Sequence, residues 1–470
     1  MAERLIIIGG VAAGMSAAAK ARRVNADLEI VVYEKSGYIS YGACGFPYFI
    51  KGDVPRLEDL IARTPEQMAA QGVMAHVCHE VVEIDPVQQI VRVMDQQNGR
   101  LLTDHWDKLI ITTGASVNRP PIPGANLPGV FTLRTVEDAL AIRRWLVEKK
   151  PKHAVIVGAG YIGLEMAEAL QAHNVAVTLV EMADQVMPGL DADLAALVQT
   201  ELQAHGVQIC LQQAVKSFLG PTLVREVVRE VAAKVQGEAG ENGRLRIHEV
   251  LTANNILAAD MVVFGAGGRP NVALAQAAGI HLGQSGAIIV DEQQRTNLPN
   301  VFAAGAAAES QHLILNKPVY WPLAAPANKQ GRVAGTNAAG GQATSEAVVG
   351  TAVVKTFDLA IAVTGLTEKQ AQSAGLAAAS VTIKASSRAH YMPDSAPIHL
   401  KLVYETGTER ILGAQMVGKD GVAQRIDVMA AALRANWTLE DVAGLDLAYA
   451  PPFAPVWDPI LLAANVARKN

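Results

Sequence analysis

The first 34 residues alternate between short apolar runs and glycine-rich or polar turns. Residues 4–8 (RLIII) predict a strand, residues 9–14 (GGVAAG) predict a tight turn, and the alanine-rich stretch to about Arg23 predicts a helix. A second apolar run at residues 29–33 predicts another strand, which ends at Glu34. The order of strand, glycine turn, helix, strand and acid is typical of a nucleotide-binding βαβ unit.

The same order of elements returns later in the chain. An apolar run at residues 155–157 leads to the turn 158–163 (GAGYIG), a helix to about His173, and a strand at residues 176–180 that ends at Glu181. The two turns start 149 residues apart, at positions 9 and 158, whereas solenoid repeats are about 20–50 residues long. The sequence therefore predicts two separate nucleotide-binding domains.

The rest of the chain contributes further strands and a different C-terminal pattern. Apolar runs at residues 109–113 and 261–264 each end in a glycine-containing turn, and we expect both strands to return the chain to a nucleotide site. Residues 225–250 are charged and predict a surface hairpin with a polar insertion. After about Thr351 the pattern predicts an α+β domain, with strands at 352–356, 381–384, 398–404 and 411–416 and helices at 423–435 and 439–443.

Composition narrows the class of protein. A length of 470 residues suits about three domains, and 50% hydrophobic with 18% charged residues suits a globular protein with an ample core. A net charge of -5 gives no basic field for nucleic acid, and no apolar run is long enough to cross a membrane. Three widely spaced cysteines predict a reducing, cytoplasmic location rather than a disulfide scaffold. We therefore expect small-molecule partners and no metal site.

The two glycine turns differ in how completely they match a dinucleotide fingerprint. Gly158, Gly160 and Gly163 form the full G-x-G-x-x-G pattern, with Glu181 eighteen residues later, whereas residues 9–14 have Val11 at the middle position. The alternative for either turn alone is an ordinary βαβ turn with incidental glycines. An acid such as Glu181 accepts from a ribose 2′-hydroxyl and repels a 2′-phosphate, and no arginine lies within residues 182–187, so NADH is favoured over NADPH.

Three further segments identify a family resemblance. Residues 40–48 (SYGACGFPY), 388–393 (RAHYMP) and 448–453 (AYAPPF) resemble motifs of the pyridine nucleotide-disulfide oxidoreductase family. The likeness is to its single-cysteine branch, which holds coenzyme A-disulfide reductases, NADH oxidases, NADH peroxidases and NAD(P)H-dependent polysulfide reductases. The resemblance covers essentially the whole chain. It implies an α/β protein with two doubly wound Rossmann-like domains and an α+β dimerisation domain, divided into FAD-binding segments 1–118 and 269–337, an NAD(P)H-binding segment 119–268 and a dimerisation segment 338–470.

The resemblance also assigns cofactors to the two turns. It implies that FAD is held by Gly9, Gly10, Ala13, Gly14, Glu34, Lys35, Thr113, Gly114, Ala115, Gly305, Ala306 and Tyr449. It implies that NADH or NADPH is held by Gly158, Gly160, Tyr161, Ile162, Gly163, Glu165, Glu181 and Gly268, with Tyr161 as a ring that yields when the nicotinamide enters. One departure is Ala306, where the family usually has an aspartate on the flavin ribitol. The loss of one charge-assisted hydrogen bond, worth roughly 1.5–3 kcal/mol, would weaken FAD binding about 10- to 100-fold.

Cys44 is the expected redox centre. Two-cysteine members of the superfamily place the second cysteine five positions later, where this chain has Phe49. A lone thiol pairs with an external sulfur or oxidises to a sulfenic acid, so the resemblance implies reduction of coenzyme A disulfide, coenzyme A persulfide or polysulfide through Cys44. The alternatives are an NADH oxidase that uses a Cys44 sulfenate, and a catalytically poor redox-sensing protein. Ala12 stands where peroxidases and many oxidases carry a histidine, which favours sulfur chemistry.

Two groups of residues are expected to complete the site. Lys20, Arg22 and Arg23 cluster at the end of the first helix with Ser16 a turn earlier, which suits a phosphate-rich ligand or simply a solvated basic helix end. The resemblance implies that these residues and Ser40 contact coenzyme A, with Ala43 and Lys20 as departures from some members. It further implies a homodimer in which Tyr391 and Tyr449, 58 residues apart, act from the other subunit as general acids.

Overall fold

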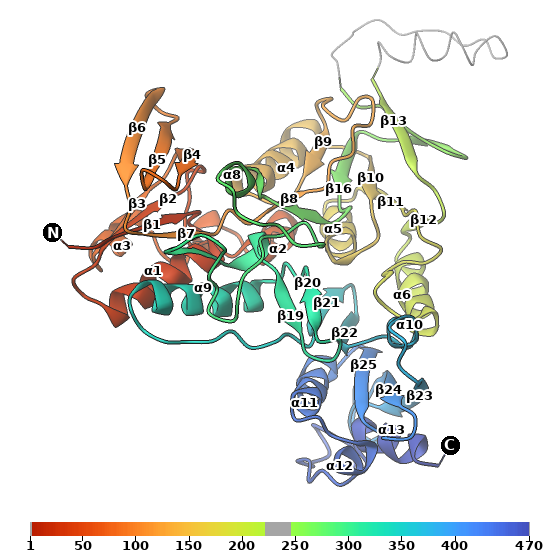
Figure 1. Ribbon diagram of the computed structural model, residues 1–470. Helices are drawn as coiled ribbons and strands as arrows, with labels where there is room; N and C mark the ends of the chain where they lie inside the picture. The colour runs from red at the N-terminus through yellow and green to blue at the C-terminus, as the bar shows by residue number, and fades with distance from the viewer. Residues whose placement is uncertain (1, 221–245, 470) are drawn as a thin grey trace, which may run out of the picture. The chain divides into compact units, whose positions relative to one another are not determined.

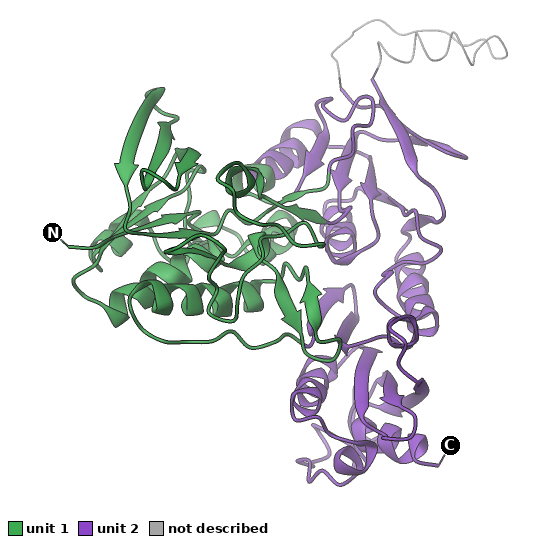
Figure 2. Cartoon of the chain, viewed as in Figure 1, with its two compact units in different colours: residues 1–118, 134–139, 268–348 green, residues 119–133, 140–267, 349–470 purple. Residues whose placement is uncertain are grey.

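The computed structural model describes residues 2–220 and 246–469, which fold into two compact units (Figures 1 and 2). Unit 1 consists of Met1–Asn118, Arg134–Ala139 and Gly268–Val348, and unit 2 of Arg119–Leu133, Leu140–Gly267 and Val349–Asn470. The hairpin expected at 225–250 falls mostly outside the described residues. Each unit is therefore assembled from three separated segments of the chain, and the domain boundaries given above stay a prediction.

Unit 1 is built on a parallel sheet with strand order β18-β7-β1-β2-β3. Its strands are β1 (Arg4–Ile8), β2 (Glu29–Tyr33), β3 (Val73–His76), β7 (Lys108–Ile111) and β18 (Val301–Ala303). Adjacent side chains of a strand point to opposite faces, and in β1 both faces are covered. Leu5 and Ile7 join a cluster with the helices α1 (Ala12–Val24) and α9 (Ala324–Ala338), while Ile6 and Ile8 join a cluster on the other face. Burial on both faces explains why this strand is a continuous apolar run.

Antiparallel strands and short helices complete unit 1. Strands β4 (His79–Asp85), β5 (Ile90–Asp95) and β6 (Arg100–His105) form a three-stranded sheet, and residues of β4 and β5 pack on the Ile6 and Ile8 face of the parallel sheet. The other elements are β8 (Ala115–Val117), β17 (Gly268–Pro270), β19 (Ser310–His312), β20 (Lys317–Val319), α2 (Phe46–Lys51), α3 (Pro65–Ala69) and α8 (Ala273–Ala277). Strand β8 pairs with β17, so the chain returns to unit 1 beside the strand by which it leaves.

Unit 2 contains the second parallel sheet, with strand order β12-β11-β10-β16-β9. Its strands are β9 (Val130–Thr132), β10 (His153–Val157), β11 (Ala176–Val180), β12 (Gln208–Cys210) and β16 (Met261–Phe264), and its helices are α5 (Tyr161–Gln171) and α6 (Ala192–Ala204). Helix α4 (Val136–Lys149) carries the chain from unit 1 into unit 2, and β13 (Val215–Leu219), β14 (Glu249–Thr252) and β15 (Ile256–Ala258) form a small antiparallel sheet. The two predicted parallel nucleotide-binding sheets are thus confirmed.

The C-terminal part of unit 2 is an antiparallel sheet with strand order β21-β22-β25-β24-β23. Its strands are β21 (Ala352–Thr356), β22 (Leu359–Gly365), β23 (Ala378–Ser386), β24 (Pro397–Glu405) and β25 (Ile411–Gly418), and its helices are α10 (Glu368–Ser373), α11 (Val422–Arg434), α12 (Leu439–Ala443) and α13 (Pro459–Ala467). The α+β prediction is confirmed, although it missed β22, α10 and α13. Among residues 2–220 and 246–469, no helix has the length and apolar character needed to span a bilayer.

Candidate active site

The first glycine turn is closed by the acid at the end of β2. Gly9 has a left-handed φ of 102°, and the next backbone N–H, that of Gly10, donates to Oε2 of Glu34 over 2.7 Å. The other carboxylate oxygen of Glu34 accepts from the N–H of Ser36 over 2.8 Å, and the side chain is buried. The carboxylate therefore holds the turn between β1 and α1 in one conformation while keeping lone pairs that could accept from a ribose.

The second turn has the same arrangement. Gly158 has a φ of 105°, and the N–H of Ala159 donates to Oε2 of Glu181 over 2.7 Å. Oε1 of Glu181 accepts from the N–H of Ala183 over 3.0 Å. The structure thus brings together the glycine turn and the acid in both predicted fingerprints, with one geometry used twice.

Both turns leave the start of the following helix open to an anion. A Cβ on Gly14 would overlap the carbonyl oxygen of Gly9, and one on Gly163 would overlap that of Gly158, so a glycine is required at each position. The residues before α1 and α5 form no side-chain cap, and neither helix has an acid in its first turn. Uncapped N–H groups at the positive end of a helix dipole are the donors that bind a pyrophosphate. The geometry of both turns fits a dinucleotide.

The strand end at residues 112–115 is fixed against the first turn by residues that the sequence did not identify. Thr112 Oγ1 donates to the carbonyl oxygens of Ile8 and Gly9 over 2.8 and 2.9 Å. The predicted residues Thr113 and Gly114 are both held by Asn271, which accepts from Thr113 Oγ1 over 2.6 Å and donates its backbone N–H to Gly114 over 2.9 Å. In the sequence, Asn271 is marked only by its position directly after the glycine-rich turn that follows the apolar run 261–264.

Arg134 is a second residue that the sequence analysis missed. Its Nε donates to the carbonyl oxygen of Ala115 over 3.0 Å. Its Nη2 lies 3.7 Å from the position that a Cβ atom on Gly114 would take. Burial, with a contribution from Glu34, raises the pKa of Tyr41 to about 12, and the charge of Arg134 opposes this shift. A cation thus lies beside residues 114 and 115 and near Tyr41 of the cysteine segment, where it could pair with a phosphate.

Gly305 and Ala306 lie in a short 3-10 turn, Gly305–Ala307, that is hydrogen-bonded to α9. Gly305 has a φ of 77°, and its N–H donates to Oε1 of the buried Gln330 over 2.8 Å. The amide nitrogen of Gln330 donates to the Glu309 carbonyl and the Ser310 hydroxyl, each over 3.0 Å. The Ala306 methyl is buried beside this turn. Gln330, which the sequence analysis missed, therefore fixes the segment in which the family aspartate is replaced by alanine.

Cys44 lies in a short 3-10 turn, Ala43–Gly45, that leads directly into α2. Its side chain is exposed, while Phe46 and Phe49 directly beyond it are buried. Phe49 therefore fills the core at the position where two-cysteine relatives would carry the second thiol. Cys78 and Cys210 are half-buried, and burial raises the pKa of the Cys210 thiol. Because the thiolate is the reactive form, Cys44 is the cysteine best placed for redox chemistry.

The residues expected to contact coenzyme A lie in different environments. Ser16 Oγ donates to Asn328 Oδ1 over 2.6 Å, and Ser40 has a φ of 51° and donates its N–H to the Gly10 carbonyl over 2.9 Å. The guanidinium of Arg22 donates to the carbonyl oxygens of Ala26, Leu28 and Gly72. Lys20 is half-buried, while Arg23 is exposed and bonds only its own helix at Ala19 among the contacts described. Arg22 is thus largely engaged in holding the connection from α1 to β2.

The remaining predicted residues lie around the two turns. Tyr161, Ile162 and Glu165 occupy the first turns of α5 and are half-buried, and burial raises the pKa of Tyr161. Lys35 is exposed directly after Glu34. Gly268 starts β17, opposite Val117 of β8. Ala13 is buried in α1.

The structure brings Tyr391 and Tyr449 together. A hydrogen bond between their side chains raises the pKa of Tyr449, although the two residues are far apart in the sequence. Both phenols are exposed, at 63% and 47%, and the segment after Tyr449 also exposes Phe453, Val456 and Trp457. An exposed cluster of large apolar side chains is typical of an interaction surface.

One group of side chains has the composition of a metal site. Ligand atoms of Glu201, His205 and Asp358 lie within 4.8 Å of one another. However, Asp358 pairs with Lys419 over 2.7 Å, and the His205 ring stacks on Phe357 with centroids 4.2 Å apart. These contacts account for the group without an ion, and we assign no metal to it.

Comparisons with known proteins match both parts of the chain. The family described as pyridine nucleotide-disulphide oxidoreductase matches residues 3–343, and its dimerisation domain matches residues 351–459. An NAD(P)H coenzyme A polysulfide/persulfide reductase of Pyrococcus horikoshii is 38% identical over 470 residues, which are 100% of this chain and 99% of the relative. An NADH oxidase of Methanocaldococcus jannaschii is 36% identical over 473 residues, covering 99% of each chain. The solved structure of an NAD-dependent persulfide reductase from A. fulgidus has a TM-score of 0.92 at 37% identity, covering 99% of this chain and 83% of its own.

Proposed function

The chain belongs to the pyridine nucleotide-disulphide oxidoreductase family, and on this premise we propose that it passes electrons from NAD(P)H through FAD and Cys44 to a sulfur substrate. The substrate class is coenzyme A disulfide, coenzyme A persulfide or polysulfide. The observation that carries the proposal is the exposed Cys44 in a turn where the buried Phe49 replaces a partner cysteine. An exposed lone thiol in such a protein takes its sulfur partner from a substrate.

The first turn is proposed to hold FAD. Its uncapped helix start suits the pyrophosphate, Glu34 suits the ribose, and Arg134 adds a positive charge beside the strand end at Ala115. FAD, when bound, supplies a two-electron acceptor for NAD(P)H and a two-electron donor for sulfur. The chain's own contribution is to hold that group with Gly9, Gly14 and the segment at residues 113–115, which Asn271 fixes.

The second turn is proposed to bind NADH in preference to NADPH. Glu181 is fixed by the N–H groups of Ala159 and Ala183, so its carboxylate cannot swing away from a ribose 2′ position. Met182 directly beyond it is 73% exposed and offers no charge for a 2′-phosphate. Tyr161 and Glu165 are assigned to the nicotinamide side of the site.

The sulfur step is a thiol–disulfide exchange on Cys44. The Cys44 thiolate attacks one sulfur of coenzyme A disulfide, which forms a mixed disulfide and releases the first coenzyme A thiolate. Two electrons from NAD(P)H then cleave the mixed disulfide and return the Cys44 thiolate and the second coenzyme A. Ser16, Lys20, Arg23 and Ser40 are proposed to contact the nucleotide part of the substrate, with Arg22 holding the helix end on which they lie. A reducing cytoplasm would keep Cys44 available between turnovers.

The tyrosines are proposed to act across a homodimer. Tyr391 and Tyr449 lie in the region that matches the family's dimerisation domain, they are hydrogen-bonded to each other, and they are exposed next to an apolar cluster. A phenol that donates a proton to a leaving thiolate acts as a general acid. We assign this role to the pair at the Cys44 site of the partner subunit.

A mixed dimer tests the role of Cys44 and the role of Tyr449 across the dimer interface in one experiment. Cys44→Ser and Tyr449→Phe subunits are co-expressed with different affinity tags, and the heterodimer is isolated. If each site combines Cys44 of one subunit with Tyr449 of the other, one of the two sites is intact and about half of the wild-type turnover returns. The parent homodimers are the controls: Cys44→Ser should have no disulfide turnover but normal NADH-driven flavin reduction, and Tyr449→Phe should lose about 100-fold or more.

Two outcomes would contradict the proposal. A heterodimer no more active than the average of its parents would place the tyrosines in the same subunit as their cysteine. Disulfide turnover that survives in Cys44→Ser would remove the thiol from the mechanism.

The second candidate function is an NADH oxidase that uses a Cys44 sulfenate. It is favoured by the 36% identity to an NADH oxidase and disfavoured by Ala12, which offers no acid–base group beside the cysteine. Turnover of the same preparation with coenzyme A disulfide and with oxygen separates the two activities. A protein purified without flavin would instead favour the third possibility, a redox-sensing protein that Ala306 has deprived of tight FAD binding.

A further inference from the structure

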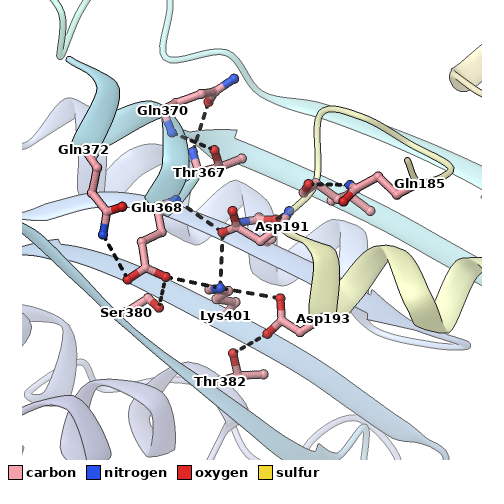
Figure 3. Close-up of polar contacts among 12 residues, drawn as sticks. Gln185, Asp191, Asp193, Thr367, Glu368, Gln370, Gln372, Ser380, Thr382 and Lys401 are labelled. Atoms are coloured by element: carbon pink, nitrogen blue, oxygen red, sulfur yellow. Dashed lines mark hydrogen bonds and ion pairs between the residues drawn. The ribbon is translucent and has the colours of Figure 1, made fainter. Parts of the chain in front are cut away.

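A nearly buried lysine in the C-terminal sheet contacts three carboxylates (Figure 3). Lys401 on β24 is 9% exposed, and its Nζ lies 3.4 Å from carboxylate oxygens of Asp191, Asp193 and Glu368. Burial alone lowers the pKa of a lysine, but the surrounding carboxylates raise the pKa of Lys401 overall. The three acids would repel one another without this cation, so Lys401 joins the start of α6 to the C-terminal sheet within unit 2.

Gln415 on the neighbouring strand holds the same aspartate by two hydrogen bonds. It lies directly opposite Lys401 in the pairing of β24 with β25 and is almost completely buried. Its Oε1 accepts from the N–H of Asp191, and its Nε2 donates to Oδ2 of Asp191, each over 2.7 Å. Asp191 occupies the N-cap position of α6, yet its carboxylate does not cap that helix. The carboxylate of Asp191 therefore binds the C-terminal sheet instead of capping its own helix.

Asp191 ends the loop that follows Glu181, and Met187 inside this loop is bound to the glycine turn. Met187 has a left-handed φ of 47° and donates its N–H to the carbonyl oxygen of Ala159 over 2.9 Å. Gln185 Nε2 donates to the carbonyl oxygens of Met187 and Leu190 over 3.3 and 2.8 Å, which closes the loop on itself. A continuous series of contacts therefore runs from Lys401 through the loop 182–190 to the second fingerprint.

From these contacts we infer that Lys401 and Gln415 are positioning residues for NAD(P)H binding. The inference rests on the proposed function, in which Glu181 and the residues after it receive the adenosine ribose. The loop 182–190 has two fixed ends, and one of them depends on the C-terminal sheet. When that end is released, the ribose side of the site loses its fixed geometry, while the first turn and Cys44 keep theirs.

The test is Lys401→Met in the full-length flavoprotein, which keeps an unbranched side chain one atom shorter and removes the charge. We expect the KM and Kd for NADH to rise about 3- to 30-fold while kcat stays within about twofold of wild type. Backbone hydrogen exchange of residues 182–190, followed by mass spectrometry without NADH, should become faster. The exchange measurement detects the loop directly and does not depend on catalysis.

Lys355→Met is the matched control. Lys355 is a strand lysine of the same sheet and pairs with Glu168 of α5 over 3.3 Å, so it reaches the nucleotide-binding part without touching the loop. Its NADH affinity and loop exchange should match those of the wild type. Because Lys401→Met leaves three carboxylates unpaired and can fail to fold, Gln415→Met provides a second variant that keeps every charge and removes only the two hydrogen bonds to Asp191.

Each outcome has one meaning. A folded Lys401→Met or Gln415→Met enzyme with wild-type Kd for NADH and wild-type loop exchange would overturn the inference. If Lys355→Met also loses affinity for NADH, the loss in Lys401→Met reflects the stability of the sheet and not the position of the loop, and the inference is overturned. If wild-type protein does not bind NADH at all, the proposed function fails, while loop exchange still reports whether Lys401 and Gln415 fix residues 182–190.

Discussion

The two glycine turns follow the same local design and differ in their surroundings. In each, the first glycine has a φ near 100°, the N–H of the next residue donates to a glutamate over 2.7 Å, and the last glycine touches the carbonyl of the first. Around the first turn, Glu34 is buried, and a Cβ on Gly10 would lie 2.8 Å from Ile39 and 3.0 Å from Glu34. Around the second, Ala159 takes the place of Gly10 and is also buried, but the acid Glu181 is only half-buried.

The proposed assignment of FAD to the first turn and NAD(P)H to the second gives this difference a reason. A cofactor that remains bound through every turnover gains from a closed, buried site, whereas a nucleotide that enters and leaves in each cycle needs an open one. The first turn is also fixed by the Thr112 hydroxyl, while the second has Gly265 in the equivalent strand position. If the first turn holds FAD and the second NAD(P)H, as proposed, the same backbone geometry serves a resident and an exchanging ligand through the packing around it.

The largest expected effect comes from adding one methyl group to either turn. In Gly14→Ala the new Cβ overlaps the Gly9 carbonyl, which no rotamer change can relieve. We expect at least about 100-fold weaker FAD binding, equivalent to about 3 kcal/mol, and a purified protein with little flavin absorbance. Gly163→Ala makes the equivalent overlap with Gly158 and should stay yellow, but its flavin should no longer be reduced by NADH.

The pair of variants decides whether the two turns have separate ligands. Absorbance of the purified proteins gives the flavin content, and anaerobic mixing with NADH gives the rate of flavin reduction. If Gly163→Ala loses its flavin as completely as Gly14→Ala, the assignment of one cofactor to each turn is wrong.

The next largest effect is expected from Glu181, the acid of the second turn. Glu181→Ala removes the acceptor of the Ala159 and Ala183 N–H groups and of the proposed ribose hydroxyl. The loss of charge-assisted hydrogen bonds worth roughly 1.5–3 kcal/mol should raise the KM for NADH about 10- to 100-fold, and the preference over NADPH should shrink. Steady-state kinetics with both nucleotides measures this, and unchanged flavin content is the control. An unchanged ratio of kcat/KM values for the two nucleotides would show that Glu181 does not select between them.

The local parts of both sites could be predicted from the sequence. Strands β1, β2, β11 and β21 have the predicted bounds, and the acids Glu34 and Glu181 lie where the spacing placed them. These features are encoded within about 30 residues, because a βαβ unit is defined by its own turn and apolar runs. The contact between Tyr391 and Tyr449 was not predicted, and their action from the other subunit, which the resemblance implies, stays a prediction.

The contacts that join distant segments could not be predicted. Asn271 and Lys401 are single polar residues whose partners lie 158 and 208 residues away in the sequence. Arg134 and Gln330 have partners only 19 and 25 residues away, but no turn or apolar pattern joins them to those partners. No periodicity or local spacing marks such a residue, since its role exists only after the chain has folded. Arg22 shows the converse: its place in a basic cluster suggested a ligand, yet its guanidinium donates to three backbone carbonyls.

The smallest predicted effect concerns Ala306 in the proposed FAD site. Ala306 lacks the carboxylate that the family places on the flavin ribitol, although the turn around it is held firmly by Gln330. Ala306→Asp should therefore strengthen FAD binding about 10-fold, because the acceptor enters a preorganised segment.

The flavin-free and flavin-bound forms of this variant should respond in opposite directions. Without FAD, the new carboxylate is buried and unpaired, so the thermal midpoint should fall below that of flavin-free wild type. With FAD, the ribitol hydroxyls satisfy the carboxylate, and dissociation of the flavin in chaotropic salt should slow. Ala306→Asn, which has the same shape without the charge, should show a smaller gain. If Ala306→Asp lowers both the midpoint and the flavin affinity, the site of this chain holds FAD without any group at position 306, and the closed packing around the first turn is sufficient for retention.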